Sequence, residues 1–163
     1  MALTYLLLGS NQGDREYFLA AGINRIGMLP GQVLIKSGIY QTAAWGLADQ
    51  PDFLNQVIFF QTSLLPEDLL AHLNRIEQEL GRVRKVKWSA RVIDIDILYY
   101  DDLILQTDNL TIPHPHLHER RFTLVPLTEI APEYRHPVLG KTTTELLTTC
   151  PDNLEVKAFS PAR

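Results

Sequence analysis

The chain has 163 residues, of which 45% are hydrophobic and 21% are charged, and its formal net charge is −4. This composition is ordinary for a soluble globular domain, and the negative charge argues against a general nucleic-acid binder. The single cysteine, Cys150, excludes an intrachain disulfide framework and a multi-cysteine zinc site. We therefore expect one domain over residues 1–163, without a membrane span, in the reducing environment of the cytoplasm.

The first half of the chain is predicted to contain three strands and two helices. The apolar run at residues 3–8 indicates a buried strand, and a helix should follow to about Met28. Strands are expected at 33–40 and 53–61, on either side of a polar loop at 42–52. Pro66 is placed to begin a second helix that ends near Gly81. Its apolar residues have helical spacing: Leu69, Leu73, Ile76 and Leu80.

After a basic loop, the second half continues with a strand at 91–98 and a short hairpin around 101–102. Residues 123–130 are predicted as another short strand or turn, and 143–148 as a last helix. The order βαββαβ with a C-terminal extension predicts an α/β (α+β) fold with a ferredoxin-like core and a mainly antiparallel sheet. That fold hosts enzymes, regulators and RNA binders, so it does not settle function.

The most informative segment reads Arg-Val-Ile-Asp-Ile-Asp-Ile-Leu, residues 91–98. Because side chains alternate along a strand, Asp94 and Asp96 should share one face, together with Val92 and Leu98. Aspartate is depleted from strands, and two adjacent carboxylates suit a hard cation such as Mg²⁺ that holds substrate phosphates. The alternative is a strand with one solvated polar face.

Basic residues are concentrated directly before this strand. Five of the fifteen lie in ten positions that contain no acid: Arg82, Arg84, Lys85, Lys87 and Arg91. In an acidic protein this favours a local polyanion, such as a nucleotide triphosphate, over a merely solvated loop.

Three further segments carry candidate chemistry. Residues 9–14, Gly-Ser-Asn-Gln-Gly-Asp, connect a strand to a helix; a tight turn with a helix cap is favoured there over a phosphate loop, since the lysine of a P-loop is missing. The side chains of Thr42, Trp45, Phe53 and Asn55 could together bind a flat heterocycle; the alternative is that the aromatic residues, Phe53 among them, belong to the core. The histidines at 114, 116 and 118 suit phosphate better than a transition metal because Arg120 and Arg121 are adjacent; a surface turn is the alternative.

These motifs, in this order, resemble the 6-hydroxymethyl-7,8-dihydropterin pyrophosphokinase family of folate biosynthesis. The resemblance extends over nearly the whole chain, through residues 9–11, 40–55, 81–84, 91–96 and 113–122. It implies an αβα sandwich around the ferredoxin-like core, in a protein that acts as a monomer. It also implies transfer of the β,γ-diphosphate of ATP to the hydroxymethyl group of the pterin, with AMP as the second product.

The resemblance also assigns roles to individual residues. Asp94 and Asp96 would bind two Mg²⁺ ions, while Arg82 and Arg91 would contact the transferring phosphates and count with the aspartates as catalytic. The expected ATP-binding residues are Asn74, Arg84, Lys87, Trp88, Ile97, Thr111, His114 and Arg120. The expected pterin-binding residues are Thr42, Ala43, Trp45, Phe53, Asn55, Trp88 and Phe122.

The loop before the aspartates departs from the family pattern. Ser89 and Ala90 stand where Gly-Pro is usual, the segment at 84–91 is one residue shorter, and Lys87 replaces a common arginine. Two other functions remain as alternatives. One is a Mg²⁺-dependent nucleotidyltransferase that releases pyrophosphate, and the other is a ferredoxin-like ligand-binding regulator without catalysis.

Overall fold

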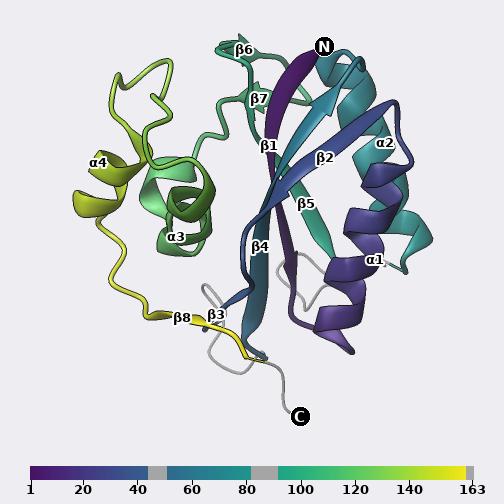
Figure 1. The fold of residues 1–163 in the computed structure, drawn as a ribbon, viewed down its shortest axis with the longest axis horizontal. Coiled ribbons are helices and arrows are strands. Elements are labelled where there is room, and N and C mark those ends of the chain that lie inside the picture. Colours follow the sequence, from purple (N-terminus) through teal and green to yellow (C-terminus); the bar gives the residue numbers. More distant parts are fainter. Residues whose placement is uncertain (44–50, 82–91, 161–163) are drawn as a thin grey trace.

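A six-stranded antiparallel sheet forms the centre of the fold (Figure 1), in a computed structural model that describes residues 1–43, 51–81 and 92–160. The strands run in the order β5-β1-β4-β3-β8, and β2 pairs with β4 as well. Their bounds are β1 (Ala2–Ser10), β2 (Gly31–Lys36), β3 (Tyr40–Thr42), β4 (Phe53–Thr62), β5 (Asp94–Tyr100) and β8 (Val156–Ala158). The core order confirms the predicted ferredoxin-like arrangement.

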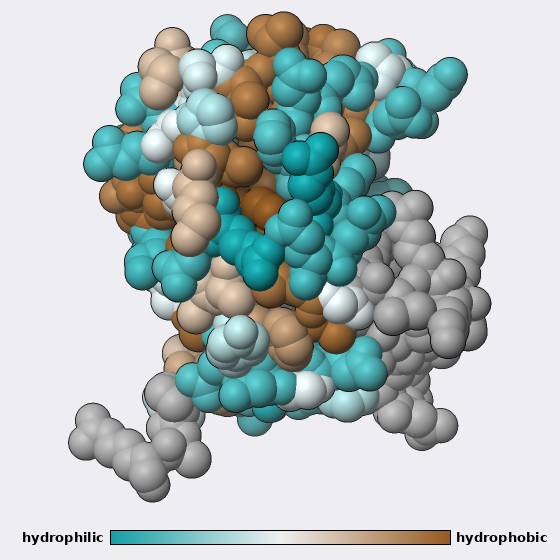
Figure 2. All heavy atoms as spheres, turned by 90° about the vertical axis from the view of Figure 1, so that its right-hand side faces the viewer, coloured by the Kyte–Doolittle hydropathy of each residue, from teal (hydrophilic) through white to brown (hydrophobic). Residues whose placement is uncertain are grey.

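Helices cover both faces of this sheet (Figure 1). α1 (Arg15–Gly27) and α2 (Pro66–Glu79) lie on one face, and α3 (Arg121–Ile130) and α4 (Thr143–Thr148) lie on the other. The result is the αβα sandwich that the family resemblance implied. Seen from the side of α1 and α2, hydrophilic residues cover much of the surface, with hydrophobic ones between them (Figure 2). Within the described parts of the chain, no helix is long and apolar enough to cross a membrane.

Strand alternation divides the core into two apolar clusters. Leu6, Leu8 and Ile58 pack beneath α1 and α2, whereas Leu7 and Val57 pack beneath α3 and α4. Each of these side chains is almost completely buried, which contributes about 1.5–3 kcal/mol per residue. The two clusters pack on opposite faces of β1, β4 and β5, the strands that carry the candidate site.

The predicted strand at 33–40 is wrong in one respect, because the structure divides it into β2 and β3. Between them the Ser37 hydroxyl accepts a hydrogen bond from the Val57 N–H (3.0 Å), and the Gln56 amide donates to the Ser37 carbonyl (2.7 Å). These side-chain bonds replace part of the regular ladder, so the chain leaves β4 and then rejoins it.

The prediction of a strand or turn at 123–130 is also wrong, since these residues belong to α3. A short apolar run cannot be assigned to strand or helix by periodicity alone. Here Leu124 and Leu127, three positions apart, are both buried against the sheet, and Pro126 lies inside the helix. Packing against β4 outweighs the weak intrinsic helix preference of the segment.

The hairpin lies further along the chain than predicted. Asp101 and Asp102 form a turn, whereas the hairpin joins β6 (Leu105–Gln106) to β7 (Thr111–Ile112). Its turn is fixed by the Thr107 hydroxyl, which accepts hydrogen bonds from the N–H groups of Asn109 (3.3 Å) and Leu110 (3.1 Å). This hairpin becomes one wall of the candidate site.

The predicted helices are otherwise confirmed. Asp14 caps α1 by accepting from the Tyr17 N–H at 3.1 Å, as the favoured cap at residues 9–14 required. Pro66 begins α2, and Gly81 follows its last residues at φ +105°, a conformation that favours glycine. α4 has the predicted bounds and begins with a capping box between Thr142 and Glu145.

Candidate functional site

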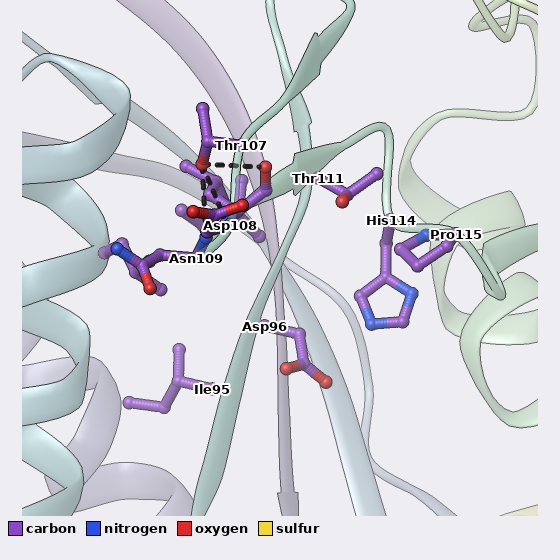
Figure 3. Close-up of a pocket in the computed structure, with 11 residues that line it drawn as sticks. Ile95, Asp96, Thr107, Asp108, Asn109, Thr111, His114 and Pro115 are labelled. Carbon is purple, nitrogen blue, oxygen red and sulfur yellow. Dashed lines mark hydrogen bonds between the residues drawn. The ribbon is translucent and has the colours of Figure 1, made fainter.

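Asp94 and Asp96 lie on the face of β5 that α3 covers, and both are partly buried. Ile93, Ile95 and Ile97 pack on the opposite face, beneath α1 and α2. Figure 3 shows Ile95 and Asp96 on opposite sides of the strand. The predicted alternation is therefore confirmed for the two aspartates.

The ends of this segment differ from a regular strand. Leu98 shares the face of the aspartates, as expected, but Val92 packs with the opposite cluster because β5 begins only at Asp94. A bulge near Leu98 then shifts the register with β1, so that Tyr99 also turns toward the face of α3. The two-residue alternation is thus local to the Asp-Ile-Asp segment.

Gly9 lies between Asp94 and Asn55 in the sheet, paired with the first across β1–β5 and with the second across β1–β4. A Cβ atom on Gly9 would approach the Asn55 Oδ1 to 2.7 Å. The glycine therefore leaves the space in which the Asn55 carboxamide lies across β1, on the same face as Asp94. Phe53 and Thr42, which pair with each other across β3–β4, continue that face.

Two polar groups on this face are buried without a partner. The Asn55 Nδ2 and the Thr42 Oγ1 have no hydrogen bond to any part of the chain that the structure describes, although both residues are at most 3% exposed. Leaving such groups unpaired costs about 1–3 kcal/mol each, which a bound ligand would offset. The donor at Asn55 and the hydroxyl at Thr42 lie on the face of the aspartates, where a ligand could pair with both.

The end of the loop that follows β3 is tied to the beginning of α1. The Arg15 guanidinium donates to the Asp52 carbonyl at 2.8 Å, and the Gln41 amide donates to the Asp52 carboxylate at 3.0 Å. Asn11 also donates to the Pro51 carbonyl at 3.4 Å. These contacts position Phe53, the first residue of β4, relative to β1.

A pocket of about 270 Å³ adjoins Asp96 along the outer edge of β5 (Figure 3). Its walls come from α2, β5, the β6–β7 hairpin and the segment after β7. The lining residues are Leu70, Ile95, Asp96, Ile97, Thr107, Asp108, Asn109, Leu110, Thr111, His114 and Pro115. Of the expected nucleotide residues, the pocket brings together Ile97, Thr111 and His114, whereas Asn74 and Arg120 do not line it. Asn74 nevertheless lies one helical turn after Leu70, on the side of α2 that packs on β5.

His114 is held as a neutral imidazole. Burial, the adjacent Arg120 and His116 lower its pKa to about 4. Its Nδ1 accepts a hydrogen bond from the His116 N–H at 3.2 Å, which leaves the proton on Nε2. His114 can therefore donate a hydrogen bond to a phosphate or sugar oxygen in the pocket without carrying charge. The other histidines of the run, His116 and His118, lie beside Glu119 instead.

Phe122 lies on α3, next to the apolar cluster beneath α3 and α4. It packs partly buried against that cluster, and the Arg120 guanidinium lies 5.6 Å from the centre of its ring. This places both residues on the same side of the sheet as the aspartates. Several expected site residues lie outside the described residues: Trp45, Arg82, Arg84, Lys87, Trp88 and Arg91. Ala43 follows β3 directly, next to Thr42.

The donor set at β5 fits Mg²⁺. Two carboxylates on one face provide the oxygen ligands that Mg²⁺ prefers, and phosphate oxygens and water usually complete its octahedron. Among the described residues there is no group of three or more His, Cys, Asp or Glu side chains that could hold a metal ion alone. A metal here would therefore depend on oxygen atoms from a bound substrate.

Sequence reasoning missed Glu77 and the hairpin side of the pocket. Glu77 lies on α2, is only 3% exposed, and its carboxylate accepts from the Ile95 N–H at 2.8 Å. The signal was present: Glu77 follows Leu73 by four positions and Leu70 by seven, which is a buried position of an amphipathic helix. Asp108 and Asn109 gave no such signal, because a polar turn is typical of any hairpin.

Comparison with known proteins identifies one family. The model of the family described as 7,8-dihydro-6-hydroxymethylpterin-pyrophosphokinase (HPPK) matches residues 5–132. A protein of Aquifex aeolicus called 2-amino-4-hydroxy-6-hydroxymethyldihydropteridine pyrophosphokinase is 43% identical over 141 residues, which is 86% of this chain and 88% of that protein. A protein of the same name from Methylorubrum extorquens is 43% identical over 90% of this chain and 92% of its own length.

Solved structures show the same fold. A Plasmodium falciparum HPPK-DHPS crystal structure with pteroate superposes with a TM-score of 0.73 at 16% identity. The match covers 90% of this chain and 42% of that one, so the present chain spans less than half of this longer protein. A second HPPK-DHPS structure, in complex with substrates, gives a TM-score of 0.72 at 15% identity. At these identities the likeness concerns the fold.

Proposed function

Because this chain belongs to the 7,8-dihydro-6-hydroxymethylpterin-pyrophosphokinase family, we propose that it transfers the β,γ-diphosphate of ATP to the hydroxymethyl group of 6-hydroxymethyl-7,8-dihydropterin. The products are the pterin diphosphate and AMP, and the reaction serves folate biosynthesis. ATP is a co-substrate, consumed in each turnover.

One observation carries this proposal: two partly buried carboxylates share one face of the sheet with two buried polar groups that have no partner among the described residues. Asp94 and Asp96 occupy β5, while Thr42 and Asn55 occupy β3 and β4 on the other side of Gly9. The carboxylates suit a metal–phosphate group, and the amide and hydroxyl suit a polar heterocycle. A diphosphate transferred between two substrates needs these two kinds of site side by side.

The pterin would occupy the end of the face at β3 and β4. A pterin ring is flat and has hydrogen-bond donors and acceptors along its edge, which the Asn55 carboxamide and the Thr42 hydroxyl can satisfy. Phe53 continues this end of the face, and we assign Phe122, on the same side of the sheet, to stack its phenyl ring on the heterocycle. We assign Ala43, Trp45 and Trp88 to the same pocket on the family pattern.

The nucleotide would occupy the pocket along the edge of β5. Leu70, Ile97 and Leu110 provide apolar surface for the base, and Asp96 and His114 lie where the phosphates would extend. In an antiparallel strand every second residue directs its N–H to the same edge. The N–H of Ile97 therefore points to the outer edge, like that of Ile95, and can donate a hydrogen bond to the base. Asn74, Thr111 and Arg120 complete this assignment, with Arg84, Lys87 and Trp88 from the segment before β5.

In the proposed reaction the pterin hydroxyl oxygen attacks the β-phosphorus of ATP. The bond from that phosphorus to the oxygen bridging the α- and β-phosphates breaks, AMP leaves with the oxygen, and the hydroxyl proton passes to solvent. Asp94 and Asp96 would hold two Mg²⁺ ions, which neutralise phosphate charge and align the attacking and leaving oxygens when bound. Arg82 and Arg91 would offset further negative charge, and His114 would donate from Nε2.

The remaining parts of the proposal concern the whole protein. We infer a single domain over residues 1–163 that acts as a monomer in the cytoplasm and requires no nucleic acid, membrane or protein partner for the reaction.

The decisive experiment identifies the products formed from Mg²⁺–ATP and the reduced pterin alcohol. Formation of AMP with the pterin diphosphate is expected. ADP with a pterin monophosphate would contradict the proposal, and released pyrophosphate would favour a nucleotidyltransferase. A regulator without catalysis would bind ligand and form no product.

The variant Asp96→Asn tests the metal role within that assay. We expect turnover to fall by at least about 100-fold, because charge stabilisation by metal ions contributes several kcal/mol to such reactions. The circular dichroism spectrum and unfolding midpoint should change little. Asp102→Asn, in the exposed turn after β5, is the matched control and should keep full activity.

A further inference from the structure

Glu77 is a carboxylate placed among apolar side chains. It lies on α2 with only 3% of its surface exposed, next to the buried Leu73 and Ile76. A carboxylate in such surroundings is costly unless hydrogen bonds and charges compensate it. An apolar side chain of similar size would need no such compensation, so the acceptor oxygens of Glu77 call for an explanation.

The contact of Glu77 with β5 falls on the residue between the two aspartates. Its Oε2 accepts from the Ile95 N–H at 2.8 Å. Among the strands that the structure describes, β5 lies at the edge of the sheet and pairs with β1 alone, so its outward N–H groups depend on partners outside those strands. A carboxylate acceptor makes a stronger bond to an N–H than a neutral acceptor does. The outer edge of the Asp-Ile-Asp segment is thereby fixed at its central residue.

Fixing Ile95 also fixes the directions of its neighbours. The side chains of Asp94 and Asp96 leave the backbone on either side of the bonded peptide group, and their separation depends on the pleat at Ile95. Metal sites are sensitive to such supporting contacts, and removing one typically weakens metal binding about 10–100-fold. Ile95 lines the nucleotide pocket as well, so the same bond supports that wall.

We propose that Glu77 is a positioning residue that sets the geometry of the Asp94–Asp96 pair for metal–nucleotide binding by anchoring the Ile95 N–H. This rests on the proposed function, because it presumes that the aspartates bind Mg²⁺ with ATP. A residue that only attached α2 to the sheet would affect stability and leave the metal dependence of nucleotide binding unchanged.

The test uses three substitutions at this position and one control. Glu77→Met removes the acceptor at similar size, Glu77→Asp keeps the charge but withdraws it by one methylene, and Glu77→Gln keeps an acceptor oxygen without charge. Glu79→Gln makes the same chemical change two residues later, where the side chain is exposed and paired with Arg25. Calorimetry measures binding of α,β-methylene ATP, which cannot transfer its diphosphate, with Mg²⁺ and with EDTA.

We expect Glu77→Met and Glu77→Asp to weaken Mg²⁺-dependent binding of the analogue at least about tenfold, with binding in EDTA changed less than threefold. Glu77→Gln should restore most of the affinity, and Glu79→Gln should match the wild type. Amide hydrogen exchange at Ile95 should accelerate in the Met and Asp variants and remain slow in the Gln variant.

Other outcomes overturn the inference. Folded Met or Asp variants that retain wild-type metal dependence would show that Glu77 only attaches the helix. If the Met variant does not fold, the Asp variant decides, since it keeps the charge and most of the packing. If the wild type itself does not bind the analogue with Mg²⁺, the proposed function fails and the inference with it; if the wild type binds and all variants bind equally, the inference alone fails.

Discussion

Gly9, which has no side chain, lies where the two halves of the site meet. The residue lies between Asp94 and Asn55, and the Asn55 carboxamide occupies the space that a larger residue would fill. The glycine is therefore required for close approach rather than for a special backbone angle. Its position explains how an amide on β4 and a carboxylate on β5 can serve one reaction across an intervening strand.

Replacing Gly9 by Ala should weaken pterin binding at least about tenfold, or about 1.4 kcal/mol. The new Cβ would lie 2.7 Å from the Asn55 Oδ1, so the carboxamide has to move away from its present place. Calorimetry with the pterin alcohol, in the presence of Mg²⁺ and α,β-methylene ATP, measures the change. Gly27→Ala is the matched control because a Cβ there meets no atom within 4 Å. Equal pterin affinity in the two variants would remove Asn55 from the pterin site.

The low pKa of His114 predicts that the folded state loses stability in mildly acidic solution. Its folded pKa of about 4 lies below the ordinary value of 6.5, so the unfolded chain binds more protons between these values. Its contribution is intact above pH 6.5 and is lost as the pH falls toward 4. From pH 7 to pH 5 the free energy of unfolding should drop by about 2 kcal/mol on account of this residue.

Urea unfolding at the two pH values, with His114→Gln for comparison, measures this contribution. The variant has no titrating group at this position and should lose about 2 kcal/mol less than the wild type over the same interval. A smaller drop remains in both proteins because burial lowers the pKa of His136 too. Identical pH dependence of the two proteins would mean that His114 is not held neutral.

At the scale of elements, Glu129 of α3 joins the helix to β3 and to the residues just before it. Its carboxylate accepts from the Tyr40 hydroxyl at 2.6 Å and from the Gly38 N–H at 3.1 Å. The hydrogen bond to Glu129 raises the pKa of Tyr40 to about 12, so the phenol stays protonated and keeps donating. Thr42, two residues after Tyr40, depends on this attachment for its place in the site.

Tyr40→Phe should lower the free energy of unfolding by about 1 kcal/mol, the usual net contribution of such a hydrogen bond. Denaturant unfolding at neutral pH measures the loss. Tyr17→Phe is a suitable control, since Tyr17 is 59% exposed and its ring contacts that of Phe18. No difference between the two variants would show that the bond is replaced by water at no cost.

The elements also show what sequence reasoning can and cannot provide. α4 and the start of α2 were predictable because their signals, a capping box and an N-terminal proline, are local. β8 was missed because Val156–Ala158 forms a strand only by pairing with β3, more than a hundred residues earlier. α3 was misassigned because its helical state depends on packing against the sheet rather than on its own sequence.

In the candidate site, the sequence could predict the residues whose side chains alternate along a strand. The sequence shows Asp94 and Asp96 as paired acids on a predicted strand, and in the structure they lie on one face. Helical spacing indicates that Glu77 is buried, but the roles of Glu77 and Gly9 arise from contacts with β5 and β4 that only the folded chain creates. Local pattern thus identified the charged groups, and tertiary contact determined how they are held.

For the whole molecule, the order of strands assembles the site from distant parts of the sequence. Residues near 9, 55 and 94 become neighbours because β1 lies between β4 and β5. The nucleotide pocket adds α2 and the β6–β7 hairpin, which the Thr107–Glu67 hydrogen bond (3.0 Å) holds together. A ligand that spans this site contacts most layers of the fold at once, so binding should stabilise the molecule as a unit.

This coupling predicts a large thermal shift that requires metal. At a concentration one hundred times its Kd, α,β-methylene ATP with Mg²⁺ should stabilise the folded state by about 2.7 kcal/mol. For a domain of this size the Tm should then rise by about 5–10 °C in scanning calorimetry.

EDTA should remove most of the shift, and Mg²⁺ alone should cause little, because two carboxylates without phosphate oxygens leave most of the metal's coordination to water. Asp94→Asn should unfold near the wild-type Tm without ligand and respond to the analogue as the wild type does in EDTA. An equal shift with and without Mg²⁺ would contradict the metal role of the aspartates, since the nucleotide would then bind through the pocket alone.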